Sequence, residues 1–427
     1  MHRVITMVGL WFALLAVLFA QAGSDSDPKT EVRDPLAQSW QTLIEAMQRA
    51  EHDVRDFEFF DSAQDQARAY LLLSRALLKG IEEQLLNDPD FPLFRIMDPR
   101  MKEGGDNPDQ RYSFAEIHGA RDYIIRGQLG SAARLEVQLY AGRPWANDGE
   151  SLDYLAFEDI ELDSNGGFQI KILRSCTDEQ ANCLNNPSNT TTVMVRQIYV
   201  DWNAEPAGEL HIDRLGFEGK AKSAPTPHGV AERINAMAYT MFQSAVTWPQ
   251  MVKTRYTDRR PPNQVSPLMD TFKLGGVQGR WMASGHFELK PHQALVIKSW
   301  PVDAPYQGIQ LTDLWFASLE YGSRVTSLTQ KQSVVAPDGA LYYVITEAET
   351  GYPNWLDTMG LAKGAFIMRY DGVGGAIDED RWPSAELIDI GLLESVIPGF
   401  KEASLTPDDR DKQRAQRRAH VQTRFGF

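Results

Sequence analysis

Apolar residues recur at steps of three and four in three stretches of the chain. These stretches cover residues 36–47, 67–85 and 230–248. Such spacing places the apolar side chains on one face of a helix, so each stretch is predicted to form an amphipathic helix. The second helix should end at residues 87–90 and the third at Pro249, because a proline cannot donate the hydrogen bond that continues a helix.

Short runs rich in β-branched and aromatic residues, bounded by Gly, Asn, Asp or Pro, predict strands joined by turns. The first set covers residues 112–117, 123–127, 133–140, 168–173, 192–201 and 209–215. The second set covers residues 281–289, 293–300, 309–317, 331–336, 341–347 and 365–371. Regularly spaced short strands indicate an antiparallel sandwich or barrel, so the chain is predicted to contain two β units.

The first 22 residues predict a signal peptide. An apolar run at residues 8–20 follows Arg3, and residues 20–22 (AQA) have the small-x-small form that signal peptidase cuts. A membrane anchor is the alternative, but a helix of this run would reach only about 20 Å of the roughly 30 Å bilayer core. We therefore expect cleavage after Ala22, no membrane span, and a periplasmic or secreted product. Residues 23–35 should form a disordered polar leader.

The C-terminal part of the chain is predicted to form a charged helix. Thr406 and Pro407 predict where this helix starts, and several arginines follow them. The helix could dock a partner through its basic stripe, or it could be a solvated helix that packs through Ala415, Val421 and Phe425. The predicted organisation is a helical region at 36–104, a first β-sandwich unit at 105–222, a linking helix at 223–264, a second β-sandwich unit at 265–400 and a C-terminal basic helix at 401–427.

Composition and charge narrow the partners. The chain of 427 residues is 43% hydrophobic and 24% charged, which is typical of a globular protein. Its net charge of −15 argues against nucleic acid and anionic lipid as partners, because both require a basic surface. A homo-oligomer remains open.

The two cysteines, Cys176 and Cys183, enclose a polar loop of six residues. In an oxidising compartment a disulfide across this loop is the simplest interpretation. A zinc site is the alternative, but the neighbouring side chains are asparagine amides, which are poor zinc ligands.

Motifs for known catalytic classes are missing from the sequence. It contains no Gly-x-Ser-x-Gly elbow, phosphate-binding loop, His-Glu-x-x-His or dinucleotide fingerprint. Among the eight histidines only His286 and His292 form even a loose pair, so neither a metal nor a cofactor is predicted.

A signature near the end of the second β unit resembles a known family. Residues 351–358 (GYPNWLDT) and 364–370 (GAFIMRY), with 301–311 (PVDAPYQGIQL) upstream, are similar to a bacterial family named only as a domain of unknown function, DUF1214. Residues 107–109, 126–127 and 195–202 resemble the segment that precedes this domain in single-chain relatives. The resemblance implies two jelly-roll-like antiparallel β-sandwich units with helical additions, in the α+β class, and implies no particular activity.

Candidate ligand-binding residues in the second unit combine flat apolar faces with polar tips. Such mixtures bind sugars or aromatic rings, through stacking and directed hydrogen bonds. Each residue also has a structural explanation, as a turn former, a core side chain or an ion-pair partner. The candidates are Trp300, Tyr306, Trp315, Asn354, Trp355, Asp357 and Arg369.

Arginines in the first unit form a second candidate group. Arg111, Arg126 and Arg196 lie on predicted strands whose side chains alternate between the two faces. If they share a face they would favour a carboxylate, sulfate or phosphate, and if they do not they would form ion pairs with nearby acidic residues.

Two functional hypotheses follow from these residues. The first is an exported protein that binds a carbohydrate or a small amphipathic or anionic ligand. The second is a periplasmic hydrolase or lyase in which Asp338 and Asp357 act as acid and base.

Overall fold

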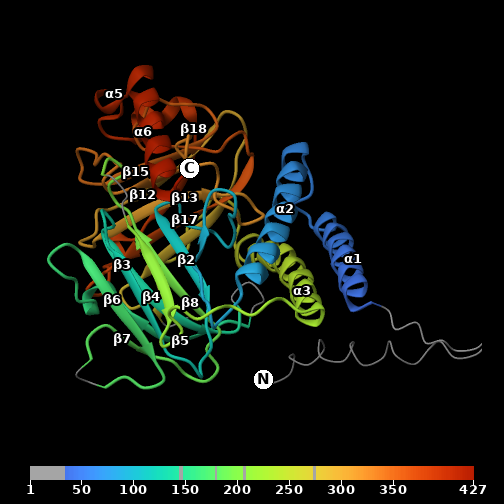
Figure 1. Ribbon diagram of the computed structural model, residues 1–427. Coiled ribbons are helices and arrows are strands. Elements are labelled where there is room, and N and C mark those ends of the chain that lie inside the picture. Colours follow the sequence, from blue (N-terminus) through green and yellow to red (C-terminus); the bar gives the residue numbers. More distant parts are fainter. Residues whose placement is uncertain (1–33, 144–147, 178–179, 205–207, 273–275) are drawn as a thin grey trace, which may run out of the picture.

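The computed structural model describes residues 34–143, 148–177, 180–204, 208–272 and 276–427 (Figure 1). The predicted signal peptide and nearly all of the predicted leader lie outside these residues. No helix in the described ranges is long and apolar enough to cross a bilayer. The helices are α1 (Pro35–Arg55), α2 (Ala63–Leu86), α3 (Pro227–Val252) with a π-helical turn at Lys253–Thr257, α4 (Leu393–Val396), α5 (Phe400–Ala403) and α6 (Pro407–Phe425).

Capping residues fix where the long helices begin. Ser62 and Asp65 form a capping box at the start of α2, and Thr406 and Asp409 form another at the start of α6. In α3 the Thr226 hydroxyl accepts a hydrogen bond from the Gly229 amide. Each cap satisfies an amide that has no partner within the helix, so these short polar sequences position the helices.

The first β unit is a sandwich of two sheets. Sheet A has the strand order β1-β2-β8-β4-β5 and sheet B has the order β7-β6-β3-β9. All neighbouring strands pair antiparallel except β6 and β7, which are parallel. The strands are β1 (Arg95–Met97), β2 (Gln110–Glu116), β3 (Tyr123–Gln128), β4 (Arg134–Ala141), β5 (Glu150–Leu155), β6 (Gly167–Leu173), β7 (Cys183–Asn185), β8 (Thr192–Ile198) and β9 (Leu210–Arg214).

The second β unit is also a sandwich. Sheet C has the order β10-β11-β17-β13-β14 and sheet D has the order β16-β15-β12-β18, with β15 and β16 parallel. The strands are β10 (Met269–Asp270), β11 (Trp281–Glu288), β12 (Gln293–Ser299), β13 (Tyr306–Thr312), β14 (Ser327–Thr329), β15 (Leu341–Thr346), β16 (Trp355–Asp357), β17 (Lys363–Asp371) and β18 (Ser384–Asp389). Together with the helices, the two sandwiches confirm the predicted α+β class.

The two units have the same strand order. Replacing each strand of sheets A and B by the strand nine places later in the chain gives sheets C and D, including the parallel pair. The sequence did not reveal this relation. Each unit buries its own core between its two sheets, for example Val137 and Val195 in the first unit and Ile309 and Met368 in the second.

Several strands differ from the sequence-based expectation. Residues 331–336 were predicted as a strand, but the strand is β14, at Ser327–Thr329. Strands β5, β7, β10, β16 and β18 were not predicted, and β1 places residues 95–97 in a sheet within the predicted helical region. These strands are short or are poor in β-branched residues, so the pattern alone did not identify them.

The C-terminal helix α6 lies against both units through its arginines. Arg410, Arg417 and Arg424, spaced by seven residues on one face, are each 1% exposed. They donate hydrogen bonds to the carbonyl groups of Tyr352, of Tyr321 and Ser327, and of Pro108. Val421 and Phe425 pack as predicted, whereas Ala415 is exposed, so the expectation of a solvated basic stripe was wrong on this face.

The predicted disulfide is confirmed. Cys176 and Cys183 are joined, with 6.0 Å between their Cα atoms. The bond closes the loop between β6 and β7, the parallel pair at the edge of sheet B.

Candidate functional site

A cavity of about 220 Å³ lies on the face of sheet A that points away from the first core. Its walls come from β1, β2, β4 and β8, from helices α2 and α3, from residues 103–106, and from Arg369 on β17. The cavity is therefore built jointly by the helices and both β units.

Alternation along the strands explains how the sequence builds this wall. On β8, Val193 and Val195 enter the first core, so Met194 and Arg196 point to the opposite face. Strand β2 follows the same rule, with Ala115 in the core. The strand residues that line the cavity are Arg95, Met97, Tyr112, Phe114, Glu116, Tyr140, Thr192, Met194, Arg196 and Arg369.

The lining is rich in charge, with five basic and four acidic side chains. The basic ones are Lys79, Arg95, Arg143, Arg196 and Arg369, and the acidic ones are Glu83, Glu103, Asp106 and Glu116. This excess of one positive charge stands out in a chain whose net charge is −15.

Two of the basic groups are paired with carboxylates of the lining. The Lys79 ammonium lies 2.5 Å from Glu103, whose carboxylate also accepts hydrogen bonds from Ser244 and Trp248. The Arg143 guanidinium contacts both Glu83 and Glu116, at 3.2 and 3.1 Å. Burial lowers the pKa of Lys79 to about 8, although Glu103 opposes this shift.

The guanidinium groups of Arg95 and Arg369 form no ion pair with a carboxylate among the residues that the structure describes. Arg95 lies over the Phe114 ring, 4.9 Å from its centroid, and contacts the Met101 sulfur. Arg369 donates to the Gln310 side chain and, at 2.6 Å, to the Gly105 carbonyl. Each guanidinium carries five N–H donors, so both retain donors for a ligand.

The arginine–glutamine pair of the second unit has a counterpart in the first. Arg196 on β8 lies opposite Glu136 and donates to Gln138, two residues further along β4. Arg369 on β17 lies opposite Gly308 and donates to Gln310, two residues further along β13. Equivalent strands of the two sandwiches thus present the same pair, and both arginines line the cavity.

The loop between β1 and β2 supplies a wall without side chains. Gly104 and Gly105 have φ values of 65° and 67°, where a Cβ atom would be strained. A Cβ at Gly105 would lie 2.6 Å from the Phe316 ring. Phe316 itself has a φ of 67°, and its carbonyl accepts a hydrogen bond from the Gly105 amide at 2.8 Å. Strained backbone of this kind is common at functional sites.

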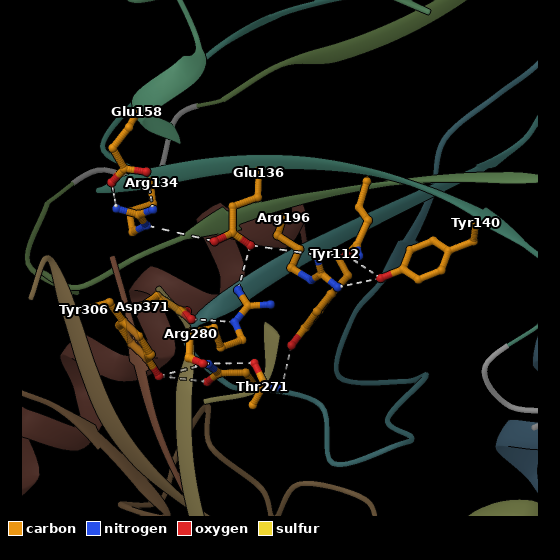
Figure 2. Close-up of polar contacts among 12 residues, drawn as sticks. Tyr112, Arg134, Glu136, Tyr140, Glu158, Arg196, Thr271, Arg280, Tyr306 and Asp371 are labelled. Atoms are coloured by element: carbon orange, nitrogen blue, oxygen red, sulfur yellow. Dashed lines mark hydrogen bonds and ion pairs between the residues drawn. The ribbon is translucent and has the colours of Figure 1, made fainter. Parts of the chain in front are cut away.

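A buried ionic network continues from Arg196 across the junction of the two units (Figure 2). The Glu136 carboxylate lies 2.6 Å from Arg280, 3.8 Å from Arg196 and 4.0 Å from Arg134. Arg280 also contacts Asp371 at 2.5 Å, and Arg134 contacts Glu158. Because Glu136 belongs to the first unit and Arg280 to the second, this network fixes the two walls of the cavity relative to each other.

The structure separates the predicted site residues. Arg196 and Arg369 lie together in the cavity. Arg111 on β2 pairs with Gln197, the residue that follows Arg196 on β8. Its side chain therefore points to the opposite side of sheet A from Arg196. Arg126 lies on β3 of sheet B, where it pairs with Asp213. The three arginines therefore do not share one face, and Arg126 follows the alternative, an ion pair with a nearby acidic residue.

The predicted aromatic groove is also absent from the part of the chain that the structure describes. Tyr306, Trp315 and Trp355 are 1%, 1% and 2% exposed, and Tyr306 and Trp315 pack in separate clusters. The indoles of Trp315 and Trp355 donate to the carbonyls of Asp65 and Thr346. Trp300 packs against the outer side of sheet D, and buried Asn354 bonds twice to the Val334 backbone. These residues support the architecture and do not line the cavity.

The two proposed catalytic carboxylates lie at opposite ends of β15. Asp338 precedes β15 and contacts Lys298 and Tyr342. Asp357 lies on β16, where it is the cross-strand partner of Thr346 at the other end of β15. The six residues of β15 span about 16 Å, which exceeds the separation at which two carboxylates act on one bond. Asp357 pairs with Arg324 at 2.7 Å instead of with Arg369.

The sequence interpretation missed most of the residues that line the cavity, above all Lys79, Glu83, Glu103 and Arg143. One signal was present in β2 and β8, where Tyr112, Phe114, Met194 and Arg196 share a face that is too apolar for solvent. The described residues contain no cluster of three or more His, Cys, Asp or Glu side chains that could hold a metal ion.

Comparisons with known proteins support the fold. No protein-family model matches the chain, and no curated protein matches it. The chain is similar to the solved structure of an uncharacterised protein from Burkholderia cenocepacia, with a TM-score of 0.75 and 21% identity over 84% of this chain and 99% of that one. A protein from Vibrio parahaemolyticus aligns with a TM-score of 0.44 and 13% identity, over 75% of this chain and 98% of that one. At 21% identity the first similarity shows the fold alone.

Proposed function

We propose that the protein binds a small anion with an apolar body in the cavity between sheet A, the helices and Arg369. The observation that carries this proposal is the pair of guanidinium groups, Arg95 and Arg369, that lack a carboxylate partner among the described residues while facing a cavity with aromatic walls. A charged group that is partly withdrawn from water and only partly neutralised attracts an opposite charge.

The size of the cavity limits the ligand. Its volume of about 220 Å³ lies below the roughly 300–1,000 Å³ of common ligand sites. This volume suits a small organic anion and is too small for an oligosaccharide. Of the ligand classes predicted from the sequence, the amphipathic anion therefore has more support than the carbohydrate.

Isothermal titration of the protein with hexanoate tests the proposal, with the uncharged analogue hexanol as the comparison ligand. Hexanoate should bind and hexanol should bind at least tenfold more weakly, because a hydrogen bond to a charged group contributes about 1.5–3 kcal/mol. The variant Arg369→Gln should lose about tenfold to a hundredfold in hexanoate affinity.

Arg126→Gln is the matched control, because Arg126 is 42% exposed and lies on sheet B away from the cavity. It should bind hexanoate like the unmodified protein. Equal losses in both variants, or no binding of hexanoate at all, would refute the proposal.

We also propose that the protein is exported and that its second unit belongs to the DUF1214 family. The Cys176–Cys183 disulfide supports an oxidising compartment, and the signature at residues 351–370 supports the family. N-terminal sequencing of the protein recovered from cells should find Gly23 as the first residue, and an uncut chain in the membrane fraction would contradict export.

A further inference from the structure

The outer faces of the two equivalent sheets contribute equivalent arginines to one cavity. Arg196 and Arg369 each donate to a glutamine on the neighbouring strand, and this bond holds each guanidinium in place. Two fixed guanidinium groups from different units can bind one anion from two sides, which neither unit could do alone.

A phenol lies beside both arginines. Tyr112 is the cross-strand neighbour of Arg196, and its hydroxyl accepts a hydrogen bond from the Asn107 amide at 3.3 Å. Burial raises the pKa of Tyr112, although Arg369 and Arg196 act in the opposite direction. The phenol therefore keeps its proton and can donate it in a hydrogen bond to an anion held by the arginines.

The walls next to this anion position are flat. The rings of Tyr112 and Phe114 are nearly parallel, at 12°, with 6.4 Å between their centroids. Gly104 and Gly105 expose only backbone to the cavity, and the Trp248 ring lies 3.0 Å from where a Gly104 Cβ would be. Aromatic side chains and a wall without side chains suit a planar ring, which can stack on the face of Phe114 that Arg95 does not cover and approach the glycines closely.

The charge of the lining sets the charge of the ligand. Lys79 and Arg143 are matched by carboxylates, and the whole lining has five basic and four acidic groups. A monovalent anion would balance this excess, whereas a divalent phosphate ester would leave one negative charge unmatched in a partly buried site.

We propose that the ligand is an aromatic monocarboxylate, with its carboxylate held between Arg196, Arg369 and the Tyr112 hydroxyl and its ring stacked on Phe114. This inference rests on the anion-binding function proposed above and adds the chemical class of the ligand.

Four probes of similar or smaller size test this class by isothermal titration with the full chain. They are benzoate, its uncharged analogue benzamide, its saturated analogue cyclohexanecarboxylate, and acetate. Benzoate should bind at least tenfold more tightly than benzamide and acetate, and about threefold to tenfold more tightly than cyclohexanecarboxylate, which lacks the aromatic face.

Variants locate the binding mode. Arg196→Lys and Arg369→Lys keep the charge but lose the planar donor pair, so each should weaken benzoate binding about tenfold. Phe114→Leu, a partly exposed position, should remove the preference for benzoate over cyclohexanecarboxylate and leave the affinity for cyclohexanecarboxylate nearly unchanged. Arg126→Lys is the control and should have no effect.

The outcomes separate this inference from the proposed function. If benzoate and cyclohexanecarboxylate bind equally while benzamide does not bind, the cavity is an anion site and the aromatic class is overturned. If only one of the two lysine variants weakens benzoate binding, the shared carboxylate position is overturned. If none of the anions binds, the proposed function fails as well.

Discussion

The strongest test of how the two units are joined is the substitution Glu136→Gln. Glu136 is 1% exposed and lies at the centre of the ionic network between the units. Glutamine keeps the shape of the side chain and removes its charge. Arg280 would retain Asp371 and Arg134 would retain Glu158, but Arg196 would keep only the neutral groups of Gln138 and Tyr140.

The expected loss can be estimated from these contacts. A charge pair at about 4 Å contributes roughly 4 kcal/mol at an effective dielectric constant of about 20. Glu136 lies 2.6 Å from Arg280 and about 4 Å from Arg196 and Arg134. Removing its charge also removes the cost of desolvating one carboxylate, which offsets part of the loss. Removing one partner of a buried ion pair typically destabilises by about 3–5 kcal/mol, and we expect this loss in the free energy of unfolding.

Urea unfolding followed by tryptophan fluorescence measures the effect, and Glu158→Gln is the matched control. Glu158 contacts the same network through Arg134, at 2.5 Å, but its side chain is 57% exposed. Exposed ion pairs contribute about 0–1 kcal/mol, so this variant should unfold almost like the unmodified protein. A Glu136→Gln loss below about 1 kcal/mol, or equal losses in the two variants, would refute the argument that burial makes this network important.

Three further predictions use other parts of the structure. Burial lowers the pKa of Lys102 from 10.5 to about 8, so between pH 8 and 10.5 the unfolded chain binds more protons than the folded chain. The free energy of unfolding, measured by urea titration, should therefore rise with pH over this window. It should rise less in Lys102→Met. Replacing Cys176 and Cys183 by serine opens a loop with a sequence separation of 7 and should lower the unfolding free energy by about 2–3 kcal/mol; an unchanged urea midpoint would contradict this. Trp355→Ala should destabilise by about 3–5 kcal/mol and leave hexanoate affinity unchanged, whereas weaker binding by folded protein would return this residue to the candidate site.

The repeating apolar pattern was sufficient to predict most of the fold. The runs at 192–201 and 365–371 became the central strands β8 and β17, because apolar residues such as Val193 and Phe366 must be buried between sheets. The helices were predicted for the same reason, with caps such as Thr406 fixing their ends. Helices, their caps and the central strands depend on residues that are close in the sequence, so the apolar pattern is enough to predict them.

The candidate site could not be predicted in the same way, because it depends on which surfaces meet. On β4, Arg134, Glu136 and Gln138 alternate with core residues, and such alternation normally indicates a solvent-facing side. In the folded protein this side is covered by the second unit, and the polar residues become a buried network. On β4, nothing local in the sequence distinguishes a polar face that meets water from one that meets another domain.

The aromatic residues of the second unit illustrate the opposite error. Trp315 and Trp355 were interpreted as ligand-binding because tryptophan is common in binding grooves, yet both fill space between elements that are distant in the chain. The indole of Trp315 reaches the Asp65 carbonyl at the start of α2, a contact that spans 250 residues of sequence. Large side chains with one polar atom suit such junctions as well as they suit ligands.

The common strand order suggests which residues matter at the junction of the two units. Strand β4 pairs with the central strand β8 from Arg134–Ile198 onward, and β13 pairs with the central strand β17 from Tyr306–Asp371 onward. When the two units are aligned at these first pairs, most residues differ between them. Leu139 and Leu311 agree, and both are core residues with 0% exposure. The outward-facing positions that agree are the glutamine on the strand next to the central one and the arginine on the central strand. A core leucine is explained by packing, whereas an identical arginine–glutamine pair on two polar faces is explained by the anion that we propose lies between the two arginines.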